Sequence, residues 1–185
     1  MTITSEVREG LLAAIPSLRA FAISLCGNVD RADDLVQEAL TRAITHIDLF
    51  EPDTKLEAWL FTILRNYFYS EHRKRAREVP DTKGTYAATL TAMPDQEDKA
   101  AHKDFLAALQ KLPREQREAL LLVGAQGLSY EEAAQVACVA VGTIKSRVHR
   151  ARGNLAQLLG LSGPDDVGAG PVFQAAASPA AFSRR

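Results

Sequence analysis

Apolar residues recur at every third or fourth position along most of the chain, the spacing that places them on one face of an α-helix. In the amino-terminal part this pattern predicts helices over about residues 5–26, 30–48 and 55–77. We expect Pro16 to bend the first helix. Gly27 is expected to end that helix, and Asp30 to cap the second one.

The same period predicts which side chains turn inward. On the third helix the expected inner stripe consists of Leu56, Trp59, Leu60, Ile63 and Tyr67. On the second helix the outer face is then left with Asp33, Asp34, Gln37, Glu38 and Thr41. No stretch alternates with a period of two and β-branched enrichment, so we predict an all-α fold without a sheet.

The helical pattern is interrupted over residues 79–101, where Pro80, Gly84 and Pro94 stand among scattered threonine and alanine residues. Such a composition is typical of a linker. Residues 163–185 are rich in glycine, alanine, proline and serine and are predicted to form a flexible tail. We therefore expect two small helical domains, with a domain at 1–78, a flexible linker at 79–102, a second domain at 103–161 and a tail at 162–185.

The bulk composition narrows the class of protein. The chain has 185 residues, 46% of them hydrophobic, which suffices for one large or two small cores. Its two cysteines, Cys26 and Cys138, lie in apolar helical surroundings and are expected to be buried thiols in a reducing cytoplasm. The first ten residues lack an export signal, and no apolar run is expected to reach the roughly 18 residues of a membrane span.

Charge is segregated along a chain whose formal net charge is only −1. Residues 30–57 carry eight acidic against three basic side chains, and residues 65–77 carry five basic against one acidic. Residues 142–161 add four basic side chains and no acidic one. This asymmetry favours one surface for a polyanion and another for a basic partner, although solvated helices often carry charge as well.

The final basic stretch belongs to a helix-turn-helix pattern. Ser129 and Glu132 form a capping box that starts a short helix, small residues at 137–140 break it, and a second helix begins near Val141. The inner stripe of that second helix is Ile144, Val148, Ala151 and Leu155. Its outer positions, which could meet DNA phosphates and base edges in the major groove, are Thr143, Lys145, Ser146, His149 and Arg150.

The segment GLSYEEAAQVACVAVGTIKSRVHRARGNL closely resembles the region 4 helix-turn-helix of extracytoplasmic-function sigma factors of bacterial RNA polymerase. In that family the second helix reads the −35 promoter element. The resemblance therefore implies promoter contacts by Thr143, Lys145, Ser146, Arg147, His149 and Arg150. Ala140 stands where many relatives have proline, and His149 occupies a variable position that is expected to affect base preference.

The amino-terminal half is similar to region 2 of the same family. DDLVQEALTRA at 33–43 resembles region 2.2, with which these factors bind the β′ clamp helices of the polymerase. By resemblance the polymerase-binding residues are Asp33, Asp34, Gln37 and Glu38. The family also implies a contact of region 4 with the β flap of the polymerase. The LFTILRNYFYSEHRKRAREV stretch looks like the alphaproteobacterial general-stress subgroup, and this resemblance implies an anti-sigma partner.

LEAWLFTILRNYFYSEHRKRAR at 56–77 resembles regions 2.3 and 2.4, which recognise and melt the −10 element. Its aromatic residues interleave with basic ones, as stacking on unpaired bases requires. Individual rings such as Trp59 and Tyr67 are nevertheless better explained as core residues on the inner stripe. The −10 contacts implied here are Asp53, Lys55, Arg65 and Asn66, of which the first two lie in the loop at 50–55.

These features predict a cytoplasmic alternative sigma factor that binds core polymerase and promoter DNA, without a membrane, a cofactor or a metal. No nucleophile elbow, phosphate loop or metal-ligand spacing supports an enzyme. One alternative is a sigma-like decoy that sequesters an anti-sigma protein, but the basic recognition helix and the lack of room for a receiver domain count against it. Another is a plain helix-turn-helix repressor, which leaves the acidic face at 33–38 without a role.

Overall fold

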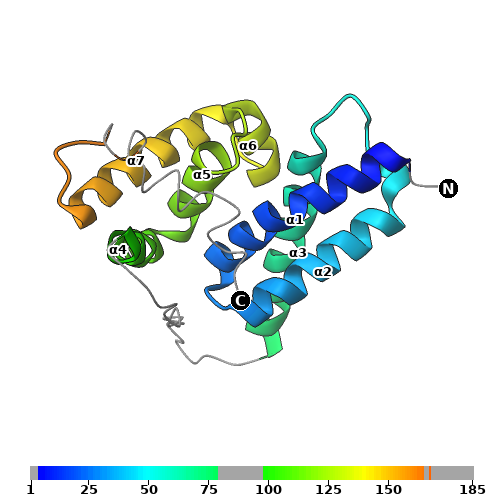
Figure 1. Ribbon diagram of the computed structural model, residues 1–185, viewed down its shortest axis with the longest axis horizontal. Helices are drawn as coiled ribbons and strands as arrows, with labels where there is room; N and C mark the ends of the chain where they lie inside the picture. Colours follow the sequence, from blue (N-terminus) through cyan, green and yellow to red (C-terminus); the bar gives the residue numbers. More distant parts are fainter. Residues whose placement is uncertain (1–3, 79–97, 165–166, 168–185) are drawn as a thin grey trace. The chain divides into compact units, whose positions relative to one another are not determined.

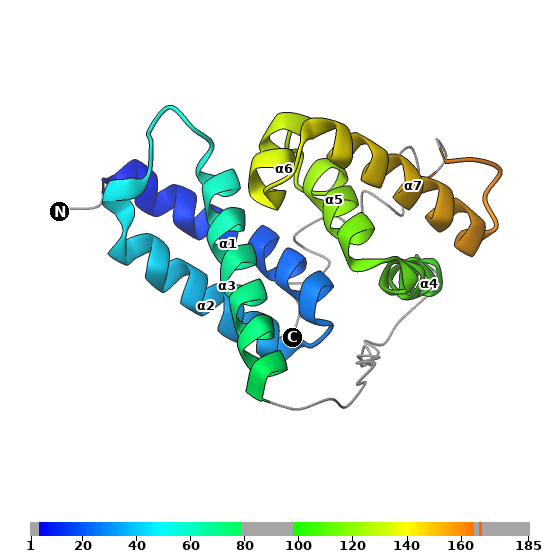
Figure 2. The ribbon, with the colours of Figure 1, turned by 180° about the vertical axis from the view of Figure 1, so that it is seen from behind.

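A computed structural model describes residues 4–78, 98–164 and 167 of the chain (Figures 1 and 2). Within these residues every regular element is helical and no strand occurs, which confirms the all-α prediction. The chain divides into two compact units, Met1–Thr89 and Leu90–Arg185. Positions 79–97 of the expected linker and most of the expected tail lie outside the described residues, and the domain boundaries stay a prediction.

The first unit contains α1 (Ser5–Cys26), α2 (Val29–Thr45), a short 3₁₀ helix η1 (Ile47–Leu49) and α3 (Leu56–Glu78). Each of the three α-helices contacts the other two. Helix α1 runs through Pro16 and ends at Gly27, whose φ of 67° is the left-handed conformation that glycine adopts most easily. The predicted end of the first helix is thus confirmed.

The predicted cap of α2 was wrong by two residues. Asn28 is the cap, since its side-chain oxygen accepts a hydrogen bond from the Arg31 amide at 2.8 Å. Its backbone is extended, at φ −136° and ψ 132°, as an N-cap residue must be. The helix therefore starts at Val29, and Asp30 falls inside its first turn, where a negative charge still favours the helix dipole.

The buried stripe of α3 is rotated from the predicted one by about one residue, or about 100°. The fully buried side chains are Leu60, Phe61, Leu64 and Phe68, each at most 1% exposed. Leu56, Trp59, Ile63 and Tyr67 are only half-buried. Two adjacent faces of this helix are apolar or aromatic, and contact with both α1 and α2 determines which of them is buried. On the buried face Phe61 packs edge-on against Phe21, with 5.2 Å between the ring centroids.

Helix α1 corrects the expectation about membrane spans, since within the described residues it is long and apolar enough to cross a membrane. Half of its most apolar window is buried inside the protein, against α2 and α3. Arg19, in the same helix, pairs with Asp33 of α2. Its apolar character is thus explained by its place as a core helix of the first unit.

The second unit contains α4 (Asp98–Lys111), α5 (Arg114–Gly124), α6 (Tyr130–Ala137) and α7 (Val141–Leu159). Helix α7 contacts each of the other three. The capping box is confirmed: Ser129 Oγ accepts from the Glu132 amide at 3.1 Å, and Glu132 Oε2 accepts from the Ser129 amide at 2.7 Å. Val167, in the segment expected to be a tail without core residues, is only 3% exposed, so that expectation was wrong at this position.

The rotated stripe of α3 yields a stability prediction. Leu64→Ala should lower the free energy of unfolding of the first unit by about 2–5 kcal/mol, because a fully buried leucine is lost. Leu56→Ala removes the same atoms from a half-buried position and should cost less than about half as much. Urea unfolding followed by the fluorescence of Trp59, the only tryptophan, measures both. An equal or larger loss for Leu56→Ala would contradict the observed stripe.

Candidate nucleic-acid and protein interfaces

Helix α7 presents a basic outer face because its apolar face is buried. The predicted inner stripe is confirmed, since Ile144, Val148, Ala151 and Leu155 are at most 2% exposed. On the outside Lys145, His149 and Arg150 are exposed, while Thr143 and Ser146 are half-buried. The N-cap of this helix, Ala140, makes no side-chain capping bond.

The outer residues of α7 differ in how they are held. Ser146 Oγ donates to the Thr143 carbonyl at 2.9 Å, which leaves its oxygen able to accept another bond. Lys145 Nζ lies 5.7 Å from the centroid of the Tyr130 ring, a cation–π contact across the turn. Within the part of the chain that the structure describes, neither His149 nor Arg150 makes a side-chain hydrogen bond or ion pair. Both side chains can therefore meet a ligand at no cost in broken contacts.

Arg147 is placed differently from the other candidates. Its Nη2 donates to Glu115 Oε2 of α5 at 2.7 Å, and its side chain is 18% exposed. About two turns further along, Asn154 Nδ2 donates to Gln116 Oε1 at 2.8 Å. Arg147 therefore lies on the side of α7 that faces α5. Sequence reasoning missed Glu115, because no local pattern connects two residues 32 positions apart.

The turn between α6 and α7 contains a cysteine in an unusual conformation. Cys138 has φ 53° and ψ 46°, the left-handed region that residues other than glycine rarely occupy. Its thiol is exposed, and Cys26 is only half-buried, so the expectation of two buried thiols was wrong. Cys26 Sγ donates to the Asn28 carbonyl at 3.1 Å, and burial is the main reason that the pKa of this thiol is raised.

The acidic face of α2 is partly neutralised within the protein. Asp33 accepts two bonds from Arg19, one of them at 3.2 Å to Nη2, and Glu38 accepts from Arg42 Nε at 2.7 Å. The side chains of Asp34 and Gln37 are exposed and have no such partner among the described residues. Asp34 is therefore the carboxylate of this predicted set whose charge remains available to a basic partner.

The candidate −10 residues fall into two groups. Asp53 and Lys55 are exposed in the loop before α3. Phe50, at the start of this loop, packs on Trp59 of α3 with ring centroids 5.3 Å apart. Asn66, exposed, lies ten residues into α3, about 15 Å along the helix axis from Leu56. The guanidinium of Arg65 lies over the Tyr69 ring at 4.7 Å. These four residues therefore lie in succession along the loop before α3 and the helix itself.

Most aromatic side chains of α3 are buried or in contact with other residues of the first unit. Phe61 and Phe68 are 1% exposed and cannot stack on DNA bases. Trp59 holds the preceding loop through Phe50, and Tyr67 lies under the guanidinium of Arg42 at 4.4 Å. The interpretation of Trp59 and Tyr67 as structural residues thus agrees with their contacts, although both are more exposed than the inner stripe required.

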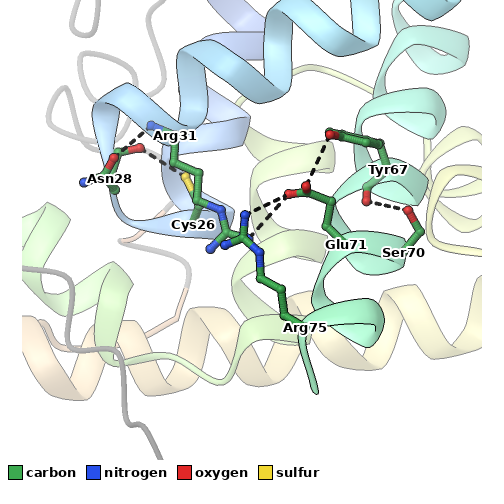
Figure 3. A network of polar contacts seen from close by, with 7 residues as sticks. All are labelled: Cys26, Asn28, Arg31, Tyr67, Ser70, Glu71 and Arg75. Carbon is green, nitrogen blue, oxygen red and sulfur yellow. Dashed lines mark hydrogen bonds and ion pairs between the residues drawn. The ribbon is translucent and has the colours of Figure 1, made fainter. Parts of the chain in front are cut away.

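Glu71 organises a polar network that the sequence did not indicate (Figure 3). Its Oε1 accepts from the Tyr67 hydroxyl at 3.3 Å, and its Oε2 lies 3.5 Å from Arg75 Nη2 and 3.9 Å from Arg31 Nη2. Burial, followed by the charge of Glu71, raises the pKa of Tyr67. Because Arg31 belongs to α2, this one carboxylate connects the start of the acidic helix with the basic end of α3.

Comparison with known proteins identifies both units. A model of the sigma-70 region 2 family matches residues 11–78, and a model of sigma-70 region 4 matches residues 102–155. The chain is 60% identical over 168 residues to the ECF RNA polymerase sigma factor EcfG of Rhodopseudomonas palustris, covering 91% of this chain and 93% of the relative.

Two solved structures extend the likeness to the fold. The sigma factor RpoE of Bartonella quintana, in complex with the anti-sigma factor NepR, is 48% identical with a TM-score of 0.77, covering 86% of this chain and 99% of that one. CnrH in complex with the cytosolic domain of CnrY is 26% identical with a TM-score of 0.54, covering 84% and 85%.

The two thiols should differ in reactivity. Cys138 is exposed, whereas Cys26 is half-buried and its raised pKa leaves less of the reactive thiolate at pH 8. With a thiol-reactive chromogenic disulfide, the folded protein should show one fast and one slow equivalent. Cys138→Ser should abolish the fast phase and Cys26→Ser the slow one. Two equal rates in the wild type would contradict the difference in burial.

Proposed function

The chain belongs to the sigma-70 family, within its extracytoplasmic-function class, and we propose that it directs RNA polymerase to stress-response promoters under the control of an anti-sigma protein. The observation that carries this proposal is the joint match of both units to sigma regions, with 60% identity to a sigma factor along nearly the whole chain. Such a protein initiates transcription in the cytoplasm and leaves the bond-making chemistry to the polymerase.

The first unit supplies the contact with the β′ clamp helices. Helix α2 presents Asp34 and Gln37, which have no side-chain partner among the described residues, beside Asp33 and Glu38, which form ion pairs with arginines of their own unit. A basic surface, as expected for the β′ clamp helices, gains most from Asp34, because no ion pair within the described part of the chain has to break first. Asp33 and Glu38 bind the same surface after exchanging their arginine partners for those of the polymerase.

Promoter melting is assigned to α3 and the loop before it. The exposed loop residues Asp53 and Lys55 and the exposed amide of Asn66 contact unpaired bases, while Arg65 follows the DNA backbone. Capture of an unstacked base offsets an unstacking cost of a few kcal/mol. The packing of Phe50 on Trp59 fixes the loop at the start of α3, so that this capture does not require the loop to be ordered first.

The second unit anchors the −35 element through α7. Lys145, His149 and Arg150 are exposed on one face of this helix, with Ser146 between them. Arginine and lysine read guanine edges or neutralise phosphates, and the Ser146 hydroxyl can accept or donate. The β flap is the expected polymerase contact of this unit.

Control by an anti-sigma protein is inferred from the relatives. The similar sigma factor RpoE was solved bound to the anti-sigma factor NepR, and the more distant CnrH was solved bound to the cytosolic domain of CnrY, so two proteins of this shape were each solved with a bound partner. The 48% identity to RpoE favours a partner of the NepR type for this chain. A decoy that only sequesters the anti-sigma protein is the alternative, and polymerase binding separates the two.

Asp34→Arg should abolish core polymerase binding and transcription. Asp34 is the carboxylate of the predicted set that forms no ion pair within the described residues, and its reversal places like charges across the interface, which should weaken core binding more than about tenfold. Core affinity and run-off transcription on a selected promoter measure this effect. Asp48→Arg, an equal change at an exposed residue of η1 outside the docking face, is the matched control. Full core binding by Asp34→Arg would refute the docking surface, and a well-folded wild type without core binding would favour the decoy.

Arg150→Ala should weaken promoter binding by the holoenzyme and leave core binding intact. Loss of a base or phosphate contact is worth about 1–3 kcal/mol, or about a 5- to 150-fold loss of affinity. If α7 neutralises about three phosphates, its share of the log–log salt slope is near −3. Promoter titrations at several salt concentrations test both numbers. Parallel loss of core binding would indicate a folding defect instead.

A further inference from the structure

The ion pair between Glu115 and Arg147 joins two helices at the edge of the candidate −35 interface. Glu115 lies in the first turn of α5, and its side chain is 67% exposed. Arg147 lies in the second turn of the recognition helix, and its 2.7 Å bond to Glu115 Oε2 leaves it 18% exposed. Among the described residues, no other α7 cation forms an ion pair.

The geometry of α7 explains why Arg147 meets α5. Successive residues on a helix are about 100° apart, so Arg147 lies about 70° from the centre of the buried stripe and on one flank of the helix. Ser146, His149 and Arg150 lie on the opposite, outward face. Asn154, seven residues after Arg147, occupies the same flank and donates to Gln116. Two consecutive residues of α5 therefore hold this flank.

The pair changes the charge that DNA meets. Residues 142–161 contain four basic side chains and no acidic one, so sequence alone counts four cations on this helix. Glu115, supplied by α5, neutralises one of them. A phosphate that approaches Arg147 competes with this carboxylate for the guanidinium, whereas Lys145 and Arg150 need to give up no carboxylate within the described residues.

We propose that Glu115 withholds Arg147 from the DNA backbone, so that Arg147 is a positioning residue of the recognition helix and not a promoter contact. This inference rests on the proposed function, in which α7 enters the major groove. It revises the role that the family resemblance implied for Arg147. The pair keeps α7 fixed on α5, and it lowers by one the number of phosphates that the unit neutralises.

The count of phosphates makes this proposal measurable. Each neutralised phosphate contributes about −0.9 to the slope of log affinity against log salt concentration. Arg147→Gln should therefore leave the slope of promoter binding by the holoenzyme unchanged. Glu115→Gln should release Arg147 to a phosphate and steepen the slope by about 0.9, so that the gain in affinity is about threefold larger at 50 mM than at 200 mM salt.

Two further variants distinguish the effect of releasing Arg147 on the salt slope from the effect of merely removing a negative charge. Glu115→Gln combined with Arg147→Gln should return to the wild-type slope, because no cation is left to release. Glu131→Gln removes an equal charge from the exposed first turn of α6, where no described cation pairs with it, and should leave the slope unchanged. Thermal melts of all variants verify that the second unit remains folded.

Three results for the salt slope would overturn the proposal. A slope reduced by about 0.9 in Arg147→Gln would show that Arg147 binds DNA and would overturn the proposal. An unchanged slope in Glu115→Gln, or a steeper slope that persists in the double variant, would overturn it as well. Arg150→Gln serves as the reference: if it has no effect on promoter binding, the assignment of α7 to the −35 element fails, which is a separate result.

Discussion

Burial of one apolar stripe on each helix is the constraint on which the two proposed interfaces depend. In the second unit α7 inserts Ile144, Val148, Ala151 and Leu155 among its neighbours, and this fixes the rotation of the helix about its axis. The outward direction of Ser146, His149 and Arg150 is then a consequence of packing. If the packing of this stripe loosened, α7 could rotate about its axis, and the register of the proposed DNA contacts would be lost.

Intramolecular ion pairs then decide how much of each charged surface is available to a partner. Asp33 is engaged by Arg19, Glu38 by Arg42 and Arg147 by Glu115. Exposed pairs of this kind add little stability, typically about 0–1 kcal/mol each. Their larger effect is on recognition, because a paired charge must give up a partner before it gains a new one. Both surfaces thus present fewer available charges than the sequence contains.

The first unit also connects the acidic face of α2 physically with the basic end of α3. Glu38 of the acidic face pairs with Arg42, Arg42 lies over the Tyr67 ring, and the Tyr67 hydroxyl donates to Glu71. Glu71 in turn pairs with Arg75 in the basic end of α3. The helix proposed to dock on the polymerase and the helix proposed to contact the melted strand therefore share a continuous set of polar and stacking contacts. This arrangement keeps α2 and α3 in a fixed relation.

Sequence alone determined most of the local structure. The period of apolar residues placed the helices, the capping box at Ser129 placed the start of α6, and the small-residue break placed the turn before α7. These features depend on residues a few positions apart, so that local hydrogen bonding and periodicity suffice to find them. The motifs of both halves also sufficed to indicate the family, which the comparisons confirmed.

Only the tertiary structure decided which face of α3 is buried and what holds Arg147. Helix α3 has two adjacent apolar faces, and the choice of Phe61 over Tyr67 as a core residue depends on where α1 and α2 lie. The Glu115–Arg147 pair connects residues 32 positions apart on different helices. A helical period fixes the angle between residues within one helix, but it contains no information about the neighbouring helix that each face will meet.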